Sequence, residues 1–362
     1  MNMNIIHLLS NKVWGSPERY ALDLCKTLRA DGFNTLVFCC SIPNICDIFA
    51  KENLLGGTMP FTGIRSIITP VILASHLNKL EGKTVIHVHN LNNVGIAINA
   101  RKLTKNPKDI KIIATCHTAK LPKPNTSEQS FYNNIDAFIF TSKLAFDTFV
   151  SLNPSIKIQK LHLIHNSVAL EPYKPKSESS AIQLIYLGNI LPEKGVDFLI
   201  NALGKLKKYD WKLTVCGAGP GRFVMPIVRA ARSLGINERI EWKGHIDEIL
   251  PELRKAHIAV FPSKEKDTIS MAIIEAMSQG CAIVTIDNDI HREILSNNKT
   301  GLLIDTSNTD SLVLAIQNLL ESQHLRDVLS QNAFDHFKED LSYSNFYEKT
   351  LKIIKNINSD GI

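Results

Sequence analysis

The chain has 362 residues, of which 44% are hydrophobic, and a formal net charge of +6. A chain of this length exceeds what one hydrophobic core usually serves, so we expect two domains. Apolar residues never run together for the roughly eighteen positions that a membrane-spanning helix needs, and the first residues lack the basic region and cleavage site of a signal peptide. We therefore expect a cytoplasmic protein. Its seven cysteines have no C-x-x-C spacing, which favours free thiols over disulfides or a zinc site.

Charge is divided unevenly along the chain. Residues 1–168 hold 18 Lys and Arg against 10 Asp and Glu (+8), and the remainder holds 23 against 25 (−2). Seven basic residues and one acid lie between Arg101 and Lys123. This stretch fits docking on an anionic membrane, at about 1 kcal/mol per charge, and fits a solvated lysine-rich surface equally well. Nucleic acid is a poor partner because the stretch has no interleaved aromatic residues.

The first half of the chain alternates strands and helices. We expect a strand at 4–9, a helix at 18–30 and a strand at 34–39, a βαβ opening that predicts a parallel sheet. Further strands are expected at 84–89, 111–116, 137–141 and 161–164.

A linker composition then follows at 168–180, with Pro172, Pro175 and the run from Ser177 to Ser180. A second series begins beyond it, with strands expected at 182–187, 212–216, 240–242, 257–261 and 282–286, and a last helix at 343–354. The fold class is therefore α/β, with two Rossmann-like parallel-sheet domains and a cleft between them.

A pair of carboxylates, Asp267 and Glu275, is the most informative pattern. A polar loop at 264–270 connects a buried strand to a helix at 271–279, which Gly280 ends. The free N–H groups of that helix face the carboxyl end of the strand, where open α/β sheets bind ligands. Glu275 lies about 12 Å along the axis from the acid before the helix, so the pair can hold two parts of one elongated ligand. Alternatively, Glu275, Ser278 and Gln279 are the solvated stripe of an amphipathic helix.

The whole phrase, with Pro262-Ser263 before it and Glu275-Ala276-Met277 within it, resembles the Glu-x7-Glu-Ala-Met signature of GT-B family 4 retaining glycosyltransferases. The resemblance implies that Glu275 accepts hydrogen bonds from the donor's ribose. It also implies that residue 267 and the following backbone amides hold the transferred sugar. Asp267 stands in place of the family's first glutamate. The residues that the resemblance implies for this sugar contact are Asp267, Thr268, Ile269, Ser270 and Met271.

Gly188 to Gly195 follows a strand and leads into a helix, so Lys194 can project its ammonium group toward a diphosphate. A solvated lysine is the alternative. The phrase resembles the family's Gly-Arg-Leu…Glu-Lys-Gly motif, whose arginine and lysine bind the donor's phosphates. Asn189 stands where that arginine belongs, so one positive charge and the several N–H donors of a guanidinium group are missing. Lys264 and Arg19 are the candidates to replace it.

Two further glycine turns lie in the second half. The run from Gly217 to Gly221 fails the dinucleotide fingerprint because Arg222 occupies its last glycine position, so a nicotinamide cofactor is not expected. It resembles the Gly-x-Gly-Pro bend of GT-B enzymes. The turn that ends at Ile246 resembles the family's Phe-x-Gly-x-Val turn, which implies that Ile246 lies by the nucleotide base. An ordinary connecting turn is the alternative in both cases.

In the first half, Trp14 and Gly15 lie in a strand-to-helix loop that resembles the family's glycine loop, which approaches donor phosphates and acceptor. Thr115-Cys116-His117-Thr118 resembles the family's Thr-x-His-Thr, which implies that His117 contacts acceptor and sugar. A core or capping histidine is the alternative. His87 and His89 share one face of a strand, and we interpret them as structural.

The resemblance implies a retaining glycosyltransferase that moves a sugar from a UDP- or GDP-sugar to a glycan or lipid-linked acceptor, in bacterial polysaccharide or lipopolysaccharide synthesis. It implies no cofactor and no metal, so Asp287-Asn288-Asp289 is interpreted as a chance D-x-D. The expected domains are 1–168 on the acceptor side, 169–340 on the nucleotide-sugar side, and a helix at 341–362 that packs back on the first. The alternatives are a degenerate GT-B protein that binds without turnover and a nucleotide-sugar epimerase. The basic first domain makes an anionic membrane a candidate partner, at the inner face of the cytoplasmic membrane.

Overall fold

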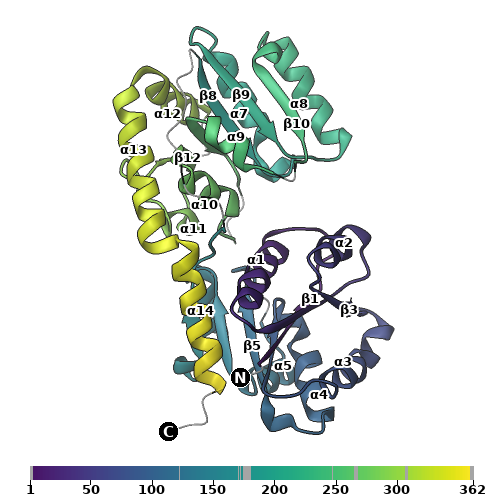
Figure 1. The fold of residues 1–362 in the computed structure, drawn as a ribbon. Helices are drawn as coiled ribbons and strands as arrows, with labels where there is room; N and C mark the ends of the chain where they lie inside the picture. Colours follow the sequence, from purple (N-terminus) through teal and green to yellow (C-terminus); the bar gives the residue numbers. More distant parts are fainter. Residues whose placement is uncertain are drawn as a thin grey trace. The chain divides into compact units, whose positions relative to one another are not determined.

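The structure is a computed structural model that describes residues 3–121, 123–169, 171, 173, 181–246, 248–264, 268–305 and 309–358. Two compact units divide the chain: unit 1 holds Met1–Asn166 and Tyr343–Ile362, and unit 2 holds Ser167–Ser342 (Figure 1). These boundaries lie two residues from those expected. Asp267 and most of the expected linker, with Pro172, Pro175 and Ser177 to Ser180, lie outside the described residues.

Unit 1 is built on a seven-stranded sheet in the order β3-β2-β1-β4-β5-β6-β7, with every neighbouring pair parallel. The strands are β1 (Asn4–Leu9), β2 (Asn34–Cys39), β3 (Leu55–Thr58), β4 (Thr84–Val88), β5 (Ile110–Cys116), β6 (Ala137–Phe140) and β7 (Leu161–Leu163). Every residue of β1 and β4 is buried, as expected for central strands that helices cover on both faces.

The helices of unit 1 are α1 (Ser16–Ala30), α2 (Pro43–Lys51), α3 (Thr69–Leu77), α4 (Val94–Leu103), α5 (Thr126–Asn133), α6 (Lys143–Leu152) and α14 (Tyr343–Asn358). Short 3₁₀ turns lie at η1 (Ile64–Ile68), η2 (Leu91–Asn93), η3 (Pro107–Asp109) and η4 (Ile158–Lys160). Helix α1 begins two residues before the expected start because Gly15 serves as its N-cap and Pro17 is accommodated in its first turn.

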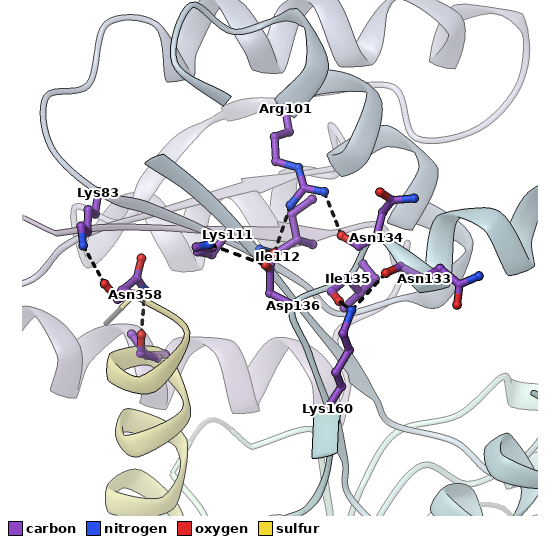
Figure 2. A network of polar contacts seen from close by, with 11 residues as sticks. Lys83, Arg101, Lys111, Ile112, Asn133, Asn134, Ile135, Asp136, Lys160 and Asn358 are labelled. Carbon is purple, nitrogen blue, oxygen red and sulfur yellow. Dashed lines mark hydrogen bonds and ion pairs between the residues drawn. The ribbon is translucent and has the colours of Figure 1, made fainter. Parts of the chain in front are cut away.

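Helix α14 returns from the far end of the chain to complete a core of unit 1. Phe346, Ile353 and Ile354 are buried against Ile5 of β1 and Leu24 of α1. The Thr27 and Tyr343 hydroxyls lie 2.9 Å apart. At the other end of the helix, the Lys83 ammonium donates to the Asn358 carbonyl at 2.6 Å, as Figure 2 shows. The last helix expected at 343–354 is confirmed and extends one turn further.

Unit 2 has a six-stranded parallel sheet in the order β10-β9-β8-β11-β12-β13. The strands are β8 (Ile182–Leu187), β9 (Trp211–Cys216), β10 (Ile240–Gly244), β11 (Ile258–Phe261), β12 (Ala282–Ile286) and β13 (Leu302–Ile304). The helices are α7 (Val196–Lys205), α8 (Gly221–Ser233), α9 (Leu250–Lys255), α10 (Met271–Ser278), α11 (Asp289–Arg292), α12 (Thr309–Glu321) and α13 (Gln323–His336), with turns η5 (Pro192–Lys194) and η6 (Asn237–Arg239) and a π-turn η7 (Phe337–Leu341). The two expected Rossmann-like sheets are thus confirmed.

Glycines let three loops at the carboxyl edge of the unit 2 sheet pack backbone against backbone. A Cβ on Gly217 would lie 1.8 Å from the Gly188 carbonyl oxygen, and one on Gly219 would lie 2.1 Å from that of Ile190. Gly195 has a φ of +70°, and its Cβ would lie 2.2 Å from the Pro262 oxygen. The loops that follow β8, β9 and β11 therefore need these glycines for their contact with one another.

We predict that Gly217→Ala destabilises unit 2 by about 1–3 kcal/mol, because the new methyl group forces the loops after β8 and β9 apart. Gly221→Ala is the matched control: a Cβ there meets nothing within 4 Å, so its effect should stay within about 0.5 kcal/mol. Urea unfolding of the two variants measures the difference. Equal midpoints would show that the loops yield without cost.

Candidate functional site

The sequence motifs lie at the carboxyl edges of the two parallel sheets. In unit 2 they follow β8, β9, β10 and β11, and in unit 1 they follow β1 and β5. Helices cover the faces of such a sheet, but they leave the carboxyl ends of the strands open. Ligands therefore reach side chains at that edge. We describe the two edges separately.

Turn η5 carries Lys194 at the carboxyl end of β8. The Tyr186 hydroxyl donates to the Asn189 carbonyl at 3.0 Å, which anchors the backbone and leaves the Asn189 side chain exposed. Gly188 has a φ of +139°, and Gly195 ends the turn in the left-handed region. Lys194 is half-buried between them. The turn therefore fixes the backbone of Lys194 and places its ammonium group at this edge of the sheet.

Lys264 lies beside that turn. Its backbone N–H donates to the Glu193 carbonyl at 2.8 Å, which joins the loop after β11 to η5, and its side chain is exposed. Arg19, the other expected replacement for the missing arginine, belongs to unit 1 and pairs with Asp23 at 2.9 Å. The geometry thus favours Lys264 as the second cation at the Lys194 edge.

His291 is a buried group near Lys194 that the sequence reasoning missed. Its Nδ1–H donates to the Ile286 carbonyl at 2.8 Å and lies 3.1 Å from the Thr285 hydroxyl. Burial lowers its pKa, the hydrogen bond to the Ile286 carbonyl opposes that shift, and the nearby Lys194 charge adds to the lowering. The net shift favours the neutral imidazole. The sequence signal that could have pointed to His291 is Asn288, which caps α11 by accepting a hydrogen bond from the His291 backbone N–H.

The aspartates of the D-x-D motif face an arginine. Asp287 accepts two hydrogen bonds from the Arg292 guanidinium, at 2.6 and 2.8 Å, and Asp289 lies 3.6 Å from it. A bidentate pair of this kind occupies carboxylate oxygens that a metal clamp would need. This geometry supports the interpretation of the motif as a chance match.

Helix α10 presents its N-terminus and Glu275 at the carboxyl end of β11. Ile273, Ile274 and Met277 are fully buried, which fixes the helix and leaves Glu275 half-buried on the polar face. Ser270, the N-cap, makes no side-chain hydrogen bond to the first turn. The Ile273 N–H bonds to the Ser270 carbonyl at 3.2 Å, so the donors at the start of the helix that a ligand could use are those of Met271 and Ala272. Thr268 and Ser270 are half-buried and Ile269 and Met271 are buried, whereas Asp267 lies outside the described residues.

Ile246 lies two residues past the end of β10. Gly244 has a φ of +66° and accepts a hydrogen bond at its carbonyl from the Gly217 N–H at 2.8 Å. This bond ties the turn to the loop after β9. Ile246 is half-buried, so part of its side chain is available at the same edge as the other motifs of unit 2.

The loop that follows β1 is held by a buried carboxylate. The Gly15 N–H donates to Glu18 Oε2 at 3.0 Å in a capping-box arrangement, and burial raises the pKa of Glu18. Glu18 Oε1 has no hydrogen-bond partner in the described part of the chain. A Cβ on Gly15 would meet only ordinary contacts, at 3.6 and 3.8 Å, so packing within the unit does not require glycine there. The Trp14 ring packs on Phe49, with centroids 5.9 Å apart.

Four histidines gather where β1, β4 and β5 lie side by side. His7 Nδ1 lies 2.9 Å from His89 Nε2, and His89 Nδ1 lies 3.2 Å from His117 Nε2. His87 bonds instead to the Thr115 hydroxyl, at 2.7 Å. The His87 and His89 rings are stacked 4.3 Å apart, which confirms the prediction that they share a face. The Tyr20 ring of α1 meets the His117 ring edge-on at 5.0 Å.

Burial keeps these histidines neutral. It lowers the pKa of His7 and that of His117 to about 3, and it holds the pKa values of His87 and His89 well below 6.5. His7, His87 and His89 each offer a nitrogen within 4.8 Å of the others, which by composition could hold a metal ion. His7 Nδ1 and His89 Nε2, however, lie 2.9 Å apart, and His87 Nε2 lies 2.7 Å from the Thr115 hydroxyl, so these nitrogens already have hydrogen-bond partners. The arrangement therefore favours hydrogen bonding.

The amino edge of the unit 1 sheet carries different features. Asp136, just before β6, lies 3.0 Å from the Arg101 guanidinium and 4.0 Å from the Lys111 ammonium, and accepts from the Ile112 N–H (Figure 2). The basic stretch from Arg101 to Lys123 is thus partly used to hold the fold. Its exposed members are Lys102, Lys105, Lys108, Lys120 and Lys123. A cavity of about 300 Å³, lined in part by Thr84, Thr104 and Ile110, also lies at this edge, away from the motifs.

An exposed apolar strip covers η1 and the start of α3. Ile64, Ile67, Ile68 and Val71 are between 54% and 88% exposed within eight residues of chain. Four large aliphatic side chains so close together on the surface are unusual for a face that meets only water. Among the described residues, no helix combines the length and apolarity needed to cross a bilayer.

Comparison with known proteins identifies the family. Residues 17–172 match the family described as Glycosyltransferase Family 4, and residues 171–336 match Glycosyl transferases group 1. A phosphatidyl-myo-inositol mannosyltransferase of Mycobacterium leprae is 24% identical over 355 residues, 90% of this chain and 89% of that protein. An N-acetylgalactosamine-N,N'-diacetylbacillosaminyl-diphospho-undecaprenol 4-alpha-N-acetylgalactosaminyltransferase of Campylobacter jejuni is 25% identical over 207 residues, 56% of this chain and 55% of that protein.

Other relatives are longer than the matched region. The chain spans 18% of an exopolysaccharide phosphotransferase of Streptomyces coelicolor (25% identical over 46% of this chain) and 39% of an alpha-D-kanosaminyltransferase of Streptomyces kanamyceticus (26% over 41%). The crystal structure of Anabaena Alr3699/HepE in complex with UDP and glucose shares the fold, with a TM-score of 0.79 and 14% identity over 97% of this chain and 99% of that one. Both halves of the sequence and both sheets agree: the chain belongs to the family 4 glycosyltransferases of the GT-B fold.

Proposed function

We propose that this protein is a retaining, metal-independent glycosyltransferase that moves a hexose-like sugar from a nucleotide diphosphate to a carbohydrate or lipid-linked acceptor. One observation carries the proposal: η5 with Lys194 and the N-terminus of α10 follow β8 and β11, which are neighbours in the unit 2 sheet. The hydrogen bond from the Lys264 N–H to the Glu193 carbonyl joins the two loops directly.

The leaving diphosphate gains negative charge as the bond between its oxygen and the anomeric carbon of the donor sugar breaks. Lys194, with Lys264 beside it, supplies positive charge where a metal ion would otherwise be needed. The first-turn amides of α10 add the positive end of a helix dipole. Glu275, half-buried on the same helix, accepts hydrogen bonds from the ribose hydroxyls. Asp267 and the backbone of Thr268 to Met271 hold the sugar.

Unit 1 supplies the acceptor side in this proposal. His117 at the end of β5 and the Trp14-Gly15 loop after β1 contact the acceptor and the transferred sugar. A leaving phosphate oxygen takes the proton of the attacking hydroxyl, so retention of configuration needs no protein nucleophile. Transfer then leaves a nucleoside diphosphate and a glycoside with the donor's anomeric configuration.

The donor and pathway are also proposed by analogy. The Anabaena protein of the same fold was crystallised with UDP and glucose, and the Campylobacter relative is named for a diphospho-undecaprenol acceptor. These names support a UDP-sugar donor and a lipid-linked acceptor, and a relative in Mycolicibacterium smegmatis that is named as GDP-mannose-dependent supports GDP as the second candidate nucleotide. A relative in Rhizobium meliloti that is named for lipopolysaccharide core biosynthesis supports a role in bacterial polysaccharide or lipopolysaccharide synthesis.

A lipid-linked acceptor places the enzyme at a membrane surface, and unit 1 offers the means. The exposed strip of Ile64, Ile67, Ile68 and Val71 provides apolar contact. Exposed Lys102, Lys105 and Lys108 follow in or just after α4, the helix against which α3 packs. Each such charge contributes about 1 kcal/mol near anionic lipid. We propose peripheral binding to the inner face of the cytoplasmic membrane through this surface.

Removal of the two unit 2 groups tests the site. We predict that Lys194→Ala lowers kcat about 100- to 1000-fold, because one preorganised charge on the leaving group is lost. Glu275→Gln should lower kcat/KM for the donor about 10- to 100-fold through the ribose contact. Transfer of radiolabelled sugar from UDP- and GDP-sugars measures both.

Lys212→Ala and Glu238→Gln are the controls for that experiment, since both side chains are exposed near the start of a strand, at the opposite edge of the sheet. Unchanged transfer by Lys194→Ala would place the site elsewhere. Donor binding without turnover in the wild type would favour the degenerate binder, and conversion of a nucleotide sugar without an acceptor would favour the epimerase.

Metal independence predicts that nucleotide binding survives a chelator. Saturating UDP or GDP should raise the apparent stability by about 2.7 kcal/mol at a hundredfold excess over Kd. Thermal unfolding with and without EDTA should show the same shift, because Lys194 and helix amides supply the positive charge. A shift that EDTA abolishes and Mg²⁺ or Mn²⁺ restores would overturn this part of the proposal.

The membrane surface is tested by vesicle sedimentation. The double variant Ile64→Ser/Ile67→Ser should bind vesicles of anionic phospholipid at least several-fold more weakly than the wild type. The reason is that two exposed aliphatic side chains, which membrane binding would bury in the bilayer interface, are lost. Leu314→Ser in unit 2, 58% exposed before substitution, is the matched control. Equal sedimentation of all three proteins would remove the strip from the proposed docking surface.

A further inference from the structure

Two of the seven cysteines meet sulfur to sulfur at the carboxyl edge of the unit 1 sheet. Cys39 is the last residue of β2, and Cys46 lies in α2, the helix that follows it. Their Sγ atoms lie 3.8 Å apart, and both residues are free thiols. A disulfide bond is about 2.05 Å long, so the two sulfurs need to approach by roughly 1.8 Å. The pair is therefore close to bonding distance before any reaction.

The surrounding protein covers the two thiols unequally. Cys39 is fully buried, whereas Cys46 is half-buried at the margin of the same small core. Burial raises the pKa of Cys39 to about 12, and the neighbouring Cys46 adds to the shift. The thiolate is the reactive form of cysteine, so Cys39 is inert toward a reagent in solution. Such a reagent therefore meets Cys46 first.

Packing alone is the alternative, because a free cysteine often serves as a small hydrophobic residue. Two neighbours illustrate that role. The Cys40 thiol donates to the Ser10 carbonyl at 3.2 Å, and the Cys25 sulfur accepts from the Thr35 hydroxyl at 3.4 Å. Cys39 differs from both, since its sulfur contacts a second sulfur that is partly open to solvent.

We propose that Cys39 and Cys46 are an oxidisable pair that forms a disulfide by exchange with a low-molecular-weight disulfide such as oxidised glutathione. In the first step, the Cys46 thiolate attacks one sulfur of the reagent, and the other sulfur leaves as a thiolate. In the second step, Cys39 Sγ attacks the Cys46 sulfur and loses its proton, and the remaining half of the reagent leaves as a thiol. Two protein thiols are thus oxidised, and one reagent disulfide is reduced to two thiols.

The new bond would tie α2 to the end of β2. Helix α2 also carries Phe49, which is fully buried and packs on the Trp14 ring, with centroids 5.9 Å apart. Trp14 and Cys46 contact the same small core. The bond should therefore restrain α2 and, through Phe49, the Trp14-Gly15 loop that follows β1. Only the consequence of this restraint for acceptor binding rests on the proposed function.

The test incubates the full protein with oxidised glutathione, blocks the remaining thiols by alkylation and analyses tryptic peptides by mass spectrometry. We expect the peptide that holds residues 39, 40 and 46 to lose two hydrogens. The thiol count of the unfolded protein should fall from seven to five. Dithiothreitol should reverse both changes. The variants Cys39→Ala and Cys46→Ser should not lose the two hydrogens.

Cys40→Ser is the matched control, because Cys40 adjoins Cys39 in the sequence and is half-buried like Cys46. This variant should still form the bond. If the change at the fully buried position 39 prevents folding, Cys46→Ser carries the test. A wild type that keeps seven thiols, or that stops at a glutathione adduct, would overturn the inference. So would a Cys39→Ala variant that still loses two hydrogens, since the bond would then join Cys40 to Cys46.

Hydrogen exchange measures the restraint. In the oxidised protein, amides of α2 and of residues 10–17 should exchange at least several-fold more slowly than in the reduced protein, because the bond suppresses local opening. Amides of unit 2 are the internal control and should not change. Equal exchange in the two forms would refute the link from the pair to the Trp14 loop. Both readouts need no substrate, so their failure and that of the transferase function are separate outcomes.

Discussion

All strands in each sheet run parallel, and this constraint organises everything else in the protein. A parallel sheet sends each strand-to-helix loop out at the same edge, so residues far apart in the sequence meet there. Lys194 and the N-terminus of α10 are separated by many residues, but β8 and β11 are neighbours, and one backbone hydrogen bond joins their loops. The strand order thus brings the two loops together, and the side chains then determine what the site can bind.

The two units use this edge in different ways. In unit 2 the backbones of the loops touch, and Gly195, Gly217 and Gly219 are required because a Cβ would collide with a neighbouring carbonyl. Such loops present amides and two lysines, Lys194 and Lys264, from a fixed backbone, which suits a charged leaving group. In unit 1 the edge is filled with stacked aromatic rings and neutral imidazoles instead. Burial lowers the pKa of all four imidazoles, so they add no positive charge at this edge.

The strong periodic patterns predicted the fold well, and the exceptions have physical causes. Buried strands such as Asn4–Leu9 and Ile182–Leu187 were predicted with their observed bounds. Strand β3 was missed because Gly56 and Gly57 carry no side chains, and the Phe38 ring fills the space above them. Strand β13 has only three residues, too few to show alternation. Motif residues at the strand ends were placed by resemblance. The histidine cluster could not be, since residues 7, 89 and 117 become neighbours only when β1, β4 and β5 are ordered.

Helix α14 has a consequence for how the chain folds as it is made. The core of unit 1 that holds Ile5, Leu24 and Tyr20 is closed by Phe346 and Ile354, which leave the ribosome only after the whole of unit 2. At about 5–20 residues per second, that delay is on the order of ten seconds or more. During that interval Ile5 and Leu24 lack the apolar side chains that later cover them, so the core of the first unit is complete only after unit 2 has been synthesised.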